Sequence, residues 1–318
     1  MTRTMEKIAL AGAGAPFLKV LHKLGVFENT LSFVGIFCYP DTGPEIKRVA
    51  QELNIPIYDI QLLNSEPGIN LLREIKIDWF FNINTTTIFS QQFLAIPKRG
   101  CLNIHPGLLP EDAGLHMNQW AIRNGELIFG STLHWMEERI DAGPIALRRR
   151  FDIQGHDTGL SVFTKASNIG VELVVEALFR ISDEISLPKI PQDLTKRRLY
   201  THNDALNGAI HWCDSAEEIV NLVRALDYYP LHSPTCQATG LLSNRELVAL
   251  KAGLWRKYPT IPGRILSISS SGLEVGTGHN SSILISKLIC PEIGLLSGDE
   301  LISSPLIELG GQFEVLND

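Results

Sequence analysis

The segment from Cys101 to Pro110 constrains the fold more than any other stretch of the sequence. It reads Cys-Leu-Asn-Ile-His-Pro-Gly-Leu-Leu-Pro, so that Asn103 and His105 lie two residues apart before Pro106 and Gly107. Side chains at positions i and i+2 of a strand point to the same face, and proline with glycine ends a strand. The pattern predicts an amide and an imidazole on one face at a strand's carboxyl end, where open α/β sheets bind ligands. A turn cap beside a surface histidine is the alternative.

A carboxylate follows downstream in a similar setting. The residues from Asn118 to Asn124 have a helical pattern, and a second strand over 130–136 leads into Glu137-Glu-Arg-Ile-Asp-Ala-Gly-Pro144. Asp141 lies in this loop, which Gly143 and Pro144 punctuate. His134, inside the second strand, fits a packed and hydrogen-bonded histidine.

The first half of the chain alternates short β-rich runs with amphipathic segments. Strands are expected over 7–11, 31–38, 55–58, 77–83 and 145–151, and helices over 17–24, 44–53, 90–95 and 158–179. The aromatic run over 77–83 is of the kind that is buried in a parallel sheet. We therefore predict an α/β domain with a Rossmann-like, mostly parallel sheet.

The turn after the first strand allows two interpretations. Gly12-Ala-Gly14 precedes a helix, so Gly12 and Gly14 could form a substrate or anion site at the helix amino terminus or a tight turn that needs small residues. The third glycine of the dinucleotide-binding pattern is missing, so no dinucleotide is expected.

The last third of the chain has a different pattern. Short strand candidates at 234–238, 246–252, 263–269, 273–277 and 282–289 are separated by Gly and Ser turns, which is typical of a small barrel. We expect a catalytic domain over 1–190, a linker over 191–207 and a second domain over 208–318.

Three motifs in order resemble those of the folate-dependent formyltransferases, which use N10-formyltetrahydrofolate. They are the segment Asn103-Ile-His-Pro-Gly-Leu-Leu-Pro110, the helix containing Trp120-Ala-Ile with Asn124-Gly125, and Ile140-Asp-Ala-Gly-Pro-Ile145. The later half is similar to the carboxyl-terminal domain of methionyl-tRNA formyltransferase, so the resemblance implies an OB-like barrel there. It also implies that Asn103, His105 and Asp141 are catalytic.

The resemblance implies two further groups of site residues and no metal. The folate site would comprise Thr86, Thr87, Ile88, Phe89, Met136, Glu137 and Ile140. Thr85 to Thr87 differ from the residues common there, and continuation of the strand is the alternative. His116, Asn118 and Trp120 would shape the acceptor pocket.

Formyl transfer explains why these residue types are needed. An uncharged amine attacks the formyl carbon and produces an oxyanion, to which Asn103 and His105 can both donate. Asp141 would accept the amine proton, directly or through water, and orient the imidazole.

The distribution of charge indicates which class of acceptor the protein uses. Residues 200–318 carry 7 Lys and Arg against 13 Asp and Glu, the opposite of a nucleic-acid-binding surface. In methionyl-tRNA formyltransferases a longer basic insertion grips the acceptor stem at the loop that here is Tyr39-Pro-Asp-Thr-Gly43. We therefore expect a small-molecule amine as acceptor, such as a nucleotide-linked amino sugar or an amino-acid-type metabolite, and no nucleic acid.

Two alternatives stay open at this point: a methionyl-tRNA formyltransferase, and a non-catalytic folate-binding or interaction protein. The 5 cysteines lack metal-site or disulfide spacing, and no apolar run approaches the roughly 20 residues that span a bilayer. We expect a cytoplasmic protein that is a monomer or a homodimer.

Overall fold

The computed structural model describes residues 4–204 and 206–315. The ends of the two expected domains at 1–3 and 316–318, and Ala205 of the expected linker, lie outside the described residues. Two compact units emerge: residues 1–114, 130–151 and 164–199 form the first, and residues 115–129, 152–163 and 200–318 form the second. Two segments of the expected catalytic domain, 115–129 and 152–163, therefore group with the second unit.

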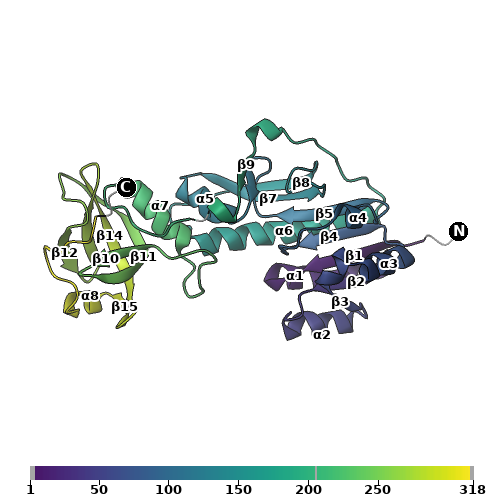
Figure 1. The fold of residues 1–318 in the computed structure, drawn as a ribbon, viewed down its shortest axis with the longest axis horizontal. Coiled ribbons are helices and arrows are strands. Elements are labelled where there is room, and N and C mark those ends of the chain that lie inside the picture. The colour runs from purple at the N-terminus through teal and green to yellow at the C-terminus, as the bar shows by residue number, and fades with distance from the viewer. Residues whose placement is uncertain (1–3, 205, 316–318) are drawn as a thin grey trace. The chain divides into compact units, whose positions relative to one another are not determined.

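The first unit is built on a sheet of seven strands in the order β3-β2-β1-β4-β5-β7-β8 (Figure 1). The strands are β1 Glu6–Gly12, β2 Leu31–Cys38, β3 Ile57–Asp59, β4 Trp79–Ile83, β5 Gly100–His105, β7 Ile128–Trp135 and β8 Ile145–Asp152. The first five strands of this order, from β3 at the edge to β5, each pair in parallel with the next. Strand β7 runs antiparallel to β5. The predicted Rossmann-like, mostly parallel sheet is confirmed, with β8 at its edge.

Alternation along the strands gives the sheet two buried faces. On β1, Ile8 and Leu10 pack in one apolar cluster, whereas Ala9 and Ala11 pack in another. The first cluster includes side chains of helices α1 Gly14–Leu21, α2 Pro44–Glu52 and α6 Gly159–Ser182. The second includes side chains of the 3₁₀ helix Ile60–Asn64 and of helices α3 Glu66–Ile75 and α4 Gln91–Leu94. We call these the α6 face and the α4 face.

Shorter elements complete the first unit. A 3₁₀ helix spans Leu24–Phe27, another spans Leu194–Lys196, and β6 Asp112–Gly114 pairs with β9 Arg198–Tyr200. The segment expected as a linker thus contains regular structure.

The second unit contains an antiparallel barrel. Its strands are β10 Thr239–Leu242, β11 Arg245–Lys257, β12 Ile265–Ser269, β13 Gly272–Thr277, β14 Ser281–Cys290 and β15 Gly294–Ser297. Residues 310–314 bond to β10 on one side, where Glu314 N donates to Leu241 O, and to β12 on the other, where Ile265 N donates to Gly311 O. This segment joins the outermost strands and fits the expected OB-like barrel.

Helices α5 Met117–Arg123, α7 Ala216–Leu226 and α8 Asp299–Ser303 and a 3₁₀ helix at His202–Asp204 also belong to the second unit. Helix α7 begins with a capping box in which the Ser215 and Glu218 side chains bond reciprocally to the main chain. This pair of bonds fixes Ser215 as the N-cap of the helix.

The strand expected over 234–238 was wrong, because this segment is irregular and β10 begins only at Thr239. Residues 84–90 form a loop, so the alternative in which β4 continues through Thr85 to Thr87 does not hold. Thr85 Oγ1 donates to Asn82 Oδ1 (2.6 Å), a local bond that turns the chain away from the sheet. Within the described ranges, no helix combines the length and apolar character needed to cross a membrane.

We predict that Gly12→Ala destabilises the first unit by about 1–3 kcal/mol, the usual range for overpacking a core. A Cβ added at Gly12 would lie 2.0 Å from the Phe17 ring, which is fully buried. The measurement is thermal unfolding beside the control Gly25→Ala, because a Cβ at Gly25 meets no atom within 4 Å. Equal unfolding temperatures for the two variants would refute this packing role.

Candidate active site

Strand β5 presents the two residues from which the site is built. Cys101 packs on the α4 face and Leu102 on the α6 face, so alternation directs Asn103 and His105 toward the α4 face. Pro106 follows directly, and Gly107 lies so close to His105 that a Cβ there would be 2.7 Å from Nε2. The expected amide and imidazole therefore share one face at the end of the strand.

Asp141 reaches this face from a loop in which its own backbone has a positive φ angle. Its φ is 51°, a left-handed conformation that aspartate tolerates better than most residues. The loop is held from outside: Gln192 Nε2 donates to the main-chain oxygens of Asp141 (3.1 Å) and Gly143 (2.6 Å), and Arg197 donates to Ile140 O (2.6 Å). The carboxylate itself accepts from Gly114 N (3.0 Å).

The three predicted catalytic residues meet in one cluster. Asp141 Oδ2 lies 3.6 Å from His105 Nδ1, and Asp141 Oδ1 lies 3.4 Å from His134 Nε2. Asn103 Nδ2 is 3.0 Å from His134 Nε2, and His105 Nε2 is 2.5 Å from Asp112 O. The His105–Asp141 contact is longer than a hydrogen bond. Because Nε2 donates to Asp112 O, Nδ1 can donate to a substrate oxygen only when the ring is protonated, with the carboxylate beside it.

The carboxyl group of Asp141 is buried but charged. Burial raises its pKa, but the charge of His105, the hydrogen bond and charge of His134 and the Gly114 amide outweigh that effect and hold the pKa well below its usual range. Asp141 is therefore a stable negative charge beside two imidazoles, and a weak base.

His134 belongs to the cluster, which the sequence did not indicate. It was expected to be packed and hydrogen-bonded, and it is: it is 3% exposed, and Nδ1 donates to Trp135 O (2.9 Å). Its other nitrogen, however, contacts Asn103 and Asp141. Only the register of β7 against β5, which pairs His134 with Asn103, brings these groups together.

The comparisons with known proteins identify the family of this chain. Residues 41–178 match the model for formyl transferase, and residues 204–305 match that for the formyl transferase C-terminal domain. Methionyl-tRNA formyltransferase of Thermodesulfovibrio yellowstonii is 30% identical over 271 residues, which is 84% of this chain and 83% of the relative. The enzyme of that name from Kosmotoga olearia is 29% identical over 309 residues, covering 93% and 96%.

The chain belongs to the formyltransferase family. Its fold is also that of an N-formyltransferase from Helicobacter canadensis, solved with folinic acid and dTDP-3-aminofucose, at a TM-score of 0.67 and 18% identity over 88% of this chain and 99% of that one. The enzyme interpretation of the sequence is confirmed, and the hypothesis of a non-catalytic binding protein is not retained.

In this formyltransferase, the segments predicted to bind folate are anchored but partly exposed. Tyr39 bonds Thr86 and Thr87 (3.3 and 3.2 Å), and Asn64 Nδ2 donates to Ile88 O (2.7 Å). Phe89 and Met136 pack on the α4 face. Ile88 and Ile140 are 70% and 51% exposed, and Glu137 is exposed. Each stays a prediction.

The residues predicted to touch the acceptor have other partners. Asn118 Nδ2 donates to Gly159 O (2.9 Å) and to the Tyr228 hydroxyl (2.6 Å), and Trp120 stacks on Tyr200. His116 precedes α5 with φ 56°, and Gly12 is covered by Phe17. Gly14 has φ 66°, which a tight turn requires. These contacts give structural reasons for Asn118, Trp120, Gly12 and Gly14 without a ligand.

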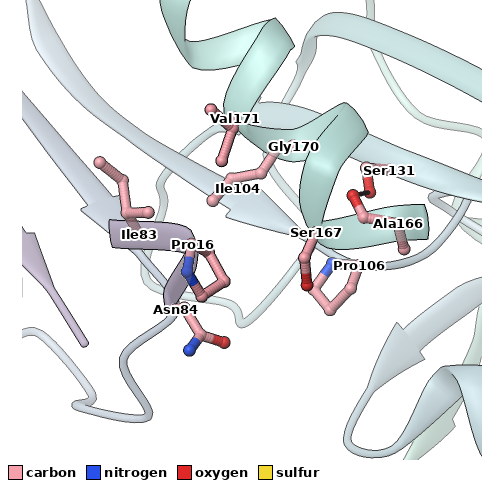
Figure 2. A pocket seen from close by; sticks show the side chains of 10 residues that line it. All are labelled: Pro16, Ile83, Asn84, Ile104, Pro106, Ser131, Ala166, Ser167, Gly170 and Val171. Carbon is pink, nitrogen blue, oxygen red and sulfur yellow. Dashed lines mark hydrogen bonds between the residues drawn. The ribbon is translucent and has the colours of Figure 1, made fainter. Parts of the chain in front are cut away.

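A small pocket lies on the α6 face (Figure 2). Ile83 and Ile104 line it together with Ser131, Ser167 and Gly170. Its volume is about 20 Å³, which suits about one water molecule. Because Ile104 alternates with Asn103 and His105 along β5, this pocket lies on the opposite face from the cluster of Asn103, His105 and Asp141. Among the described residues, no group of three or more His, Cys, Asp or Glu side chains could hold a metal ion.

The low pKa of Asp141 predicts how stability depends on pH. Its folded pKa lies below the unfolded value of about 3.9, so the ionised group stabilises the fold above about pH 4 and this contribution is lost as pH falls further. We expect the difference in unfolding free energy between wild type and Asp141→Asn to shrink from about pH 5 to about pH 3. A pH-independent difference, measured by urea unfolding, would contradict this pairing.

Proposed function

We propose that this enzyme transfers the formyl group of N10-formyltetrahydrofolate to the amine of a small-molecule acceptor. The observation that carries the proposal is the cluster of Asn103, His105 and Asp141 at the carboxyl end of β5. An amide, an imidazole and a buried carboxylate are the groups that this reaction needs, because it passes through an oxyanion and releases a proton.

In the proposed mechanism, Asn103 and His105 stabilise the oxyanion. Asn103 Nδ2 has two hydrogens, of which one is used toward His134, so the second can bond to the formyl oxygen. The protonated ring of His105 donates from Nδ1 to the same oxygen, while its Nε2 donates to Asp112 O. Preorganised donors of this kind act strongly because they need no reorganisation during the reaction.

Asp141 stabilises the positive charge on His105 while that ring donates to the oxyanion. Once Nδ1 has given its proton to that oxygen, it can receive the amine proton. A carboxylate with a pKa well below its usual range keeps its charge through the reaction. The proton released by the amine is therefore assigned to the imidazole or to water and not to Asp141. Of the two roles that the sequence predicted for Asp141, support of the imidazole is retained and direct acceptance of the amine proton is not.

The loops at 84–89 and 136–140 are the proposed folate site. Ile88 and Ile140 are large apolar side chains that remain 70% and 51% exposed. The backbone of the first loop is held in place because Thr86 N donates to the Tyr39 hydroxyl and Asn64 Nδ2 donates to Ile88 O. The N-formyltransferase of the same fold was solved with folinic acid, which supports a folate as the formyl donor.

Two features support a small acceptor. The connection between β2 and α2 is only Tyr39 to Gly43, without Lys or Arg, and residues 200–318 carry a net charge of −6. A phosphate-rich partner requires a cationic surface. The fold also accommodates amino-sugar nucleotides, as the Helicobacter canadensis protein with dTDP-3-aminofucose illustrates. The expected cytoplasmic location and monomeric or dimeric state stay predictions.

Methionyl-tRNA is the second candidate acceptor, and two observations favour it. The relatives at 29% and 30% identity carry the name methionyl-tRNA formyltransferase. In addition, β11 ends with exposed Trp255, Arg256 and Lys257, a basic and aromatic combination that suits RNA.

An acceptor screen with N10-formyltetrahydrofolate separates the two candidates. We expect efficient formylation of an amine among nucleotide-linked amino sugars and hydroxylated or basic amino acids, and little formylation of methionyl-tRNA. Product formation is measured by mass spectrometry for each acceptor. Efficient formylation of methionyl-tRNA with no small amine accepted would overturn the small-molecule proposal.

Asp141→Asn tests the catalytic cluster. The substitution preserves volume but removes the charge that supports His105, so we expect turnover to fall by ~10²–10⁴-fold, the range for a lost acid-base group. Folate affinity should stay near the wild-type value, because Asn64 still holds the 84–89 loop and Gln192 and Arg197 still hold the loop that contains Asp141. Steady-state kinetics and a folate-binding titration provide the two measurements.

Asp183→Asn is the matched control, since Asp183 is an exposed carboxylate that follows helix α6. It should leave turnover and folate binding unchanged. If Asp141→Asn keeps more than about a tenth of wild-type turnover, outside the expected range, Asp141 only shapes its loop and another carboxylate is catalytic.

A further inference from the structure

Three neighbouring strands place polar side chains in one row across the sheet. The parallel register of β4 and β5 pairs Asn82 with Asn103, and the antiparallel register of β5 and β7 pairs Asn103 with His134. Side chains of paired residues lie on the same face and next to one another. Asn82 and His134 are only 4% and 3% exposed, so their polar atoms depend on this row for hydrogen bonds.

The hydrogen bonds along the row all run in one direction. Thr85 Oγ1 donates to Asn82 Oδ1 (2.6 Å), and Asn82 Nδ2 donates to Asn103 Oδ1 (2.8 Å). Asn103 Nδ2 then bonds to His134 Nε2 (3.0 Å), and His134 Nδ1 bonds to Trp135 O (2.9 Å). Thr85, in the loop after β4, is therefore the first donor of a continuous chain that ends at a main-chain carbonyl.

Main-chain oxygens constrain the direction at both ends. A carbonyl can only accept, so His134 Nδ1 must carry a hydrogen toward Trp135 O. When Nε2 carries no hydrogen it accepts from the Asn103 NH₂ group (3.0 Å), and when it carries one it faces Asp141 Oδ1 (3.4 Å) as a donor. An acceptor at Nε2 requires the NH₂ group of Asn103 rather than its oxygen. At the near end, the NH₂ of Asn82 faces both Asn103 Oδ1 and, at 3.5 Å, Thr85 O.

This direction decides what Asn103 presents to a substrate. Its NH₂ group lies toward His134, whose Nε2 is 3.4 Å from Asp141, and its oxygen lies toward Asn82. A reversed amide would turn a carbonyl oxygen toward the catalytic carboxylate, where it would repel a developing oxyanion. The amide therefore has one productive orientation, and isolated asparagine side chains have no preference between the two.

We propose that Asn82, His134 and Thr85 are positioning residues that hold the Asn103 amide with its NH₂ group toward the reacting formyl oxygen. The proposal rests on the proposed function, in which Asn103 stabilises the oxyanion. Asn82 and His134 act through Asn103 and do not themselves contact the formyl group. Thr85 acts one step further away, through Asn82.

The test combines substitutions of the row with removal of Asn103. Asn82→Leu and His134→Leu keep approximate size but remove the bonds to either end of the Asn103 amide. We expect each to lower kcat by at least about tenfold and by no more than the ~10²–10³-fold that follows loss of an oxyanion donor. Acceptor KM and folate affinity should change little, and thermal unfolding identifies any variant that has lost its fold.

Two further comparisons distinguish positioning from a general structural role. His134→Gln retains an acceptor oxygen for the Asn103 NH₂ group, so it should recover most of the kcat lost in His134→Leu. In an Asn103→Ala background, Asn82→Leu and His134→Leu should cause little additional loss, because residues that act through one group are not additive. Thr85→Val should show a smaller loss that also disappears in this background.

The kcat values distinguish failure of the oxyanion role of Asn103 from failure of the positioning role of Asn82, His134 and Thr85. If Asn103→Ala retains wild-type kcat, the proposed oxyanion role itself fails. If Asn103→Ala is impaired but the row variants keep wild-type kcat, or lower kcat equally in both backgrounds, the positioning role fails while the proposed function stands.

Discussion

The buried carboxylate of Asp141 is the interaction on which the rest of the site depends. An ionised group that is only 8% exposed is strongly unfavourable unless charges and hydrogen bonds compensate for the lost water. Here the compensation comes from Gly114 N and two imidazoles. Strands β5 and β7, the β6 segment and the 137–143 loop must therefore converge on one point, and the outer contacts of Gln192 and Arg197 hold that loop in place.

The two faces of the sheet differ in composition because successive side chains of a strand point to opposite faces. On the α6 face, Ile83, Ile104 and Leu133 contribute to a continuous apolar packing that includes α1, α2 and α6. On the α4 face, the polar row of Asn82, Asn103 and His134 interrupts the apolar cluster at the carboxyl end of the strands. Buried polar groups of this kind are stable only when each is satisfied, and satisfying them also orients the amide proposed to act in catalysis.

Family membership determines the type of reaction, whereas the acceptor depends on surfaces outside the cluster. The short 39–43 connection and the negative charge of the second unit argue for a small amine. The exposed Trp255, Arg256 and Lys257 on β11 form a local basic segment within residues 200–318, whose net charge is negative. Counting charges over a whole domain is therefore a weaker guide to the acceptor than the location of those charges.

The sequence by itself determined the elements and the three catalytic candidates. Strand alternation, glycine and proline punctuation and the spacing of apolar residues are local properties, so they identified β5, the Asp141 loop and most helices. Even there, a local side-chain bond from Thr85 ended β4 where β-branched residues alone allowed its continuation.

Only the tertiary structure decided which side chains meet. His134 and Asn82 lie far along the chain from Asn103 on either side, and the pairing of β7 and β4 with β5 sets them beside it. Asn118 and Trp120 looked available in the sequence but bond or stack with Tyr228 and Tyr200. Strand register and long-range burial are cooperative properties of the folded chain, and no local pattern encodes them.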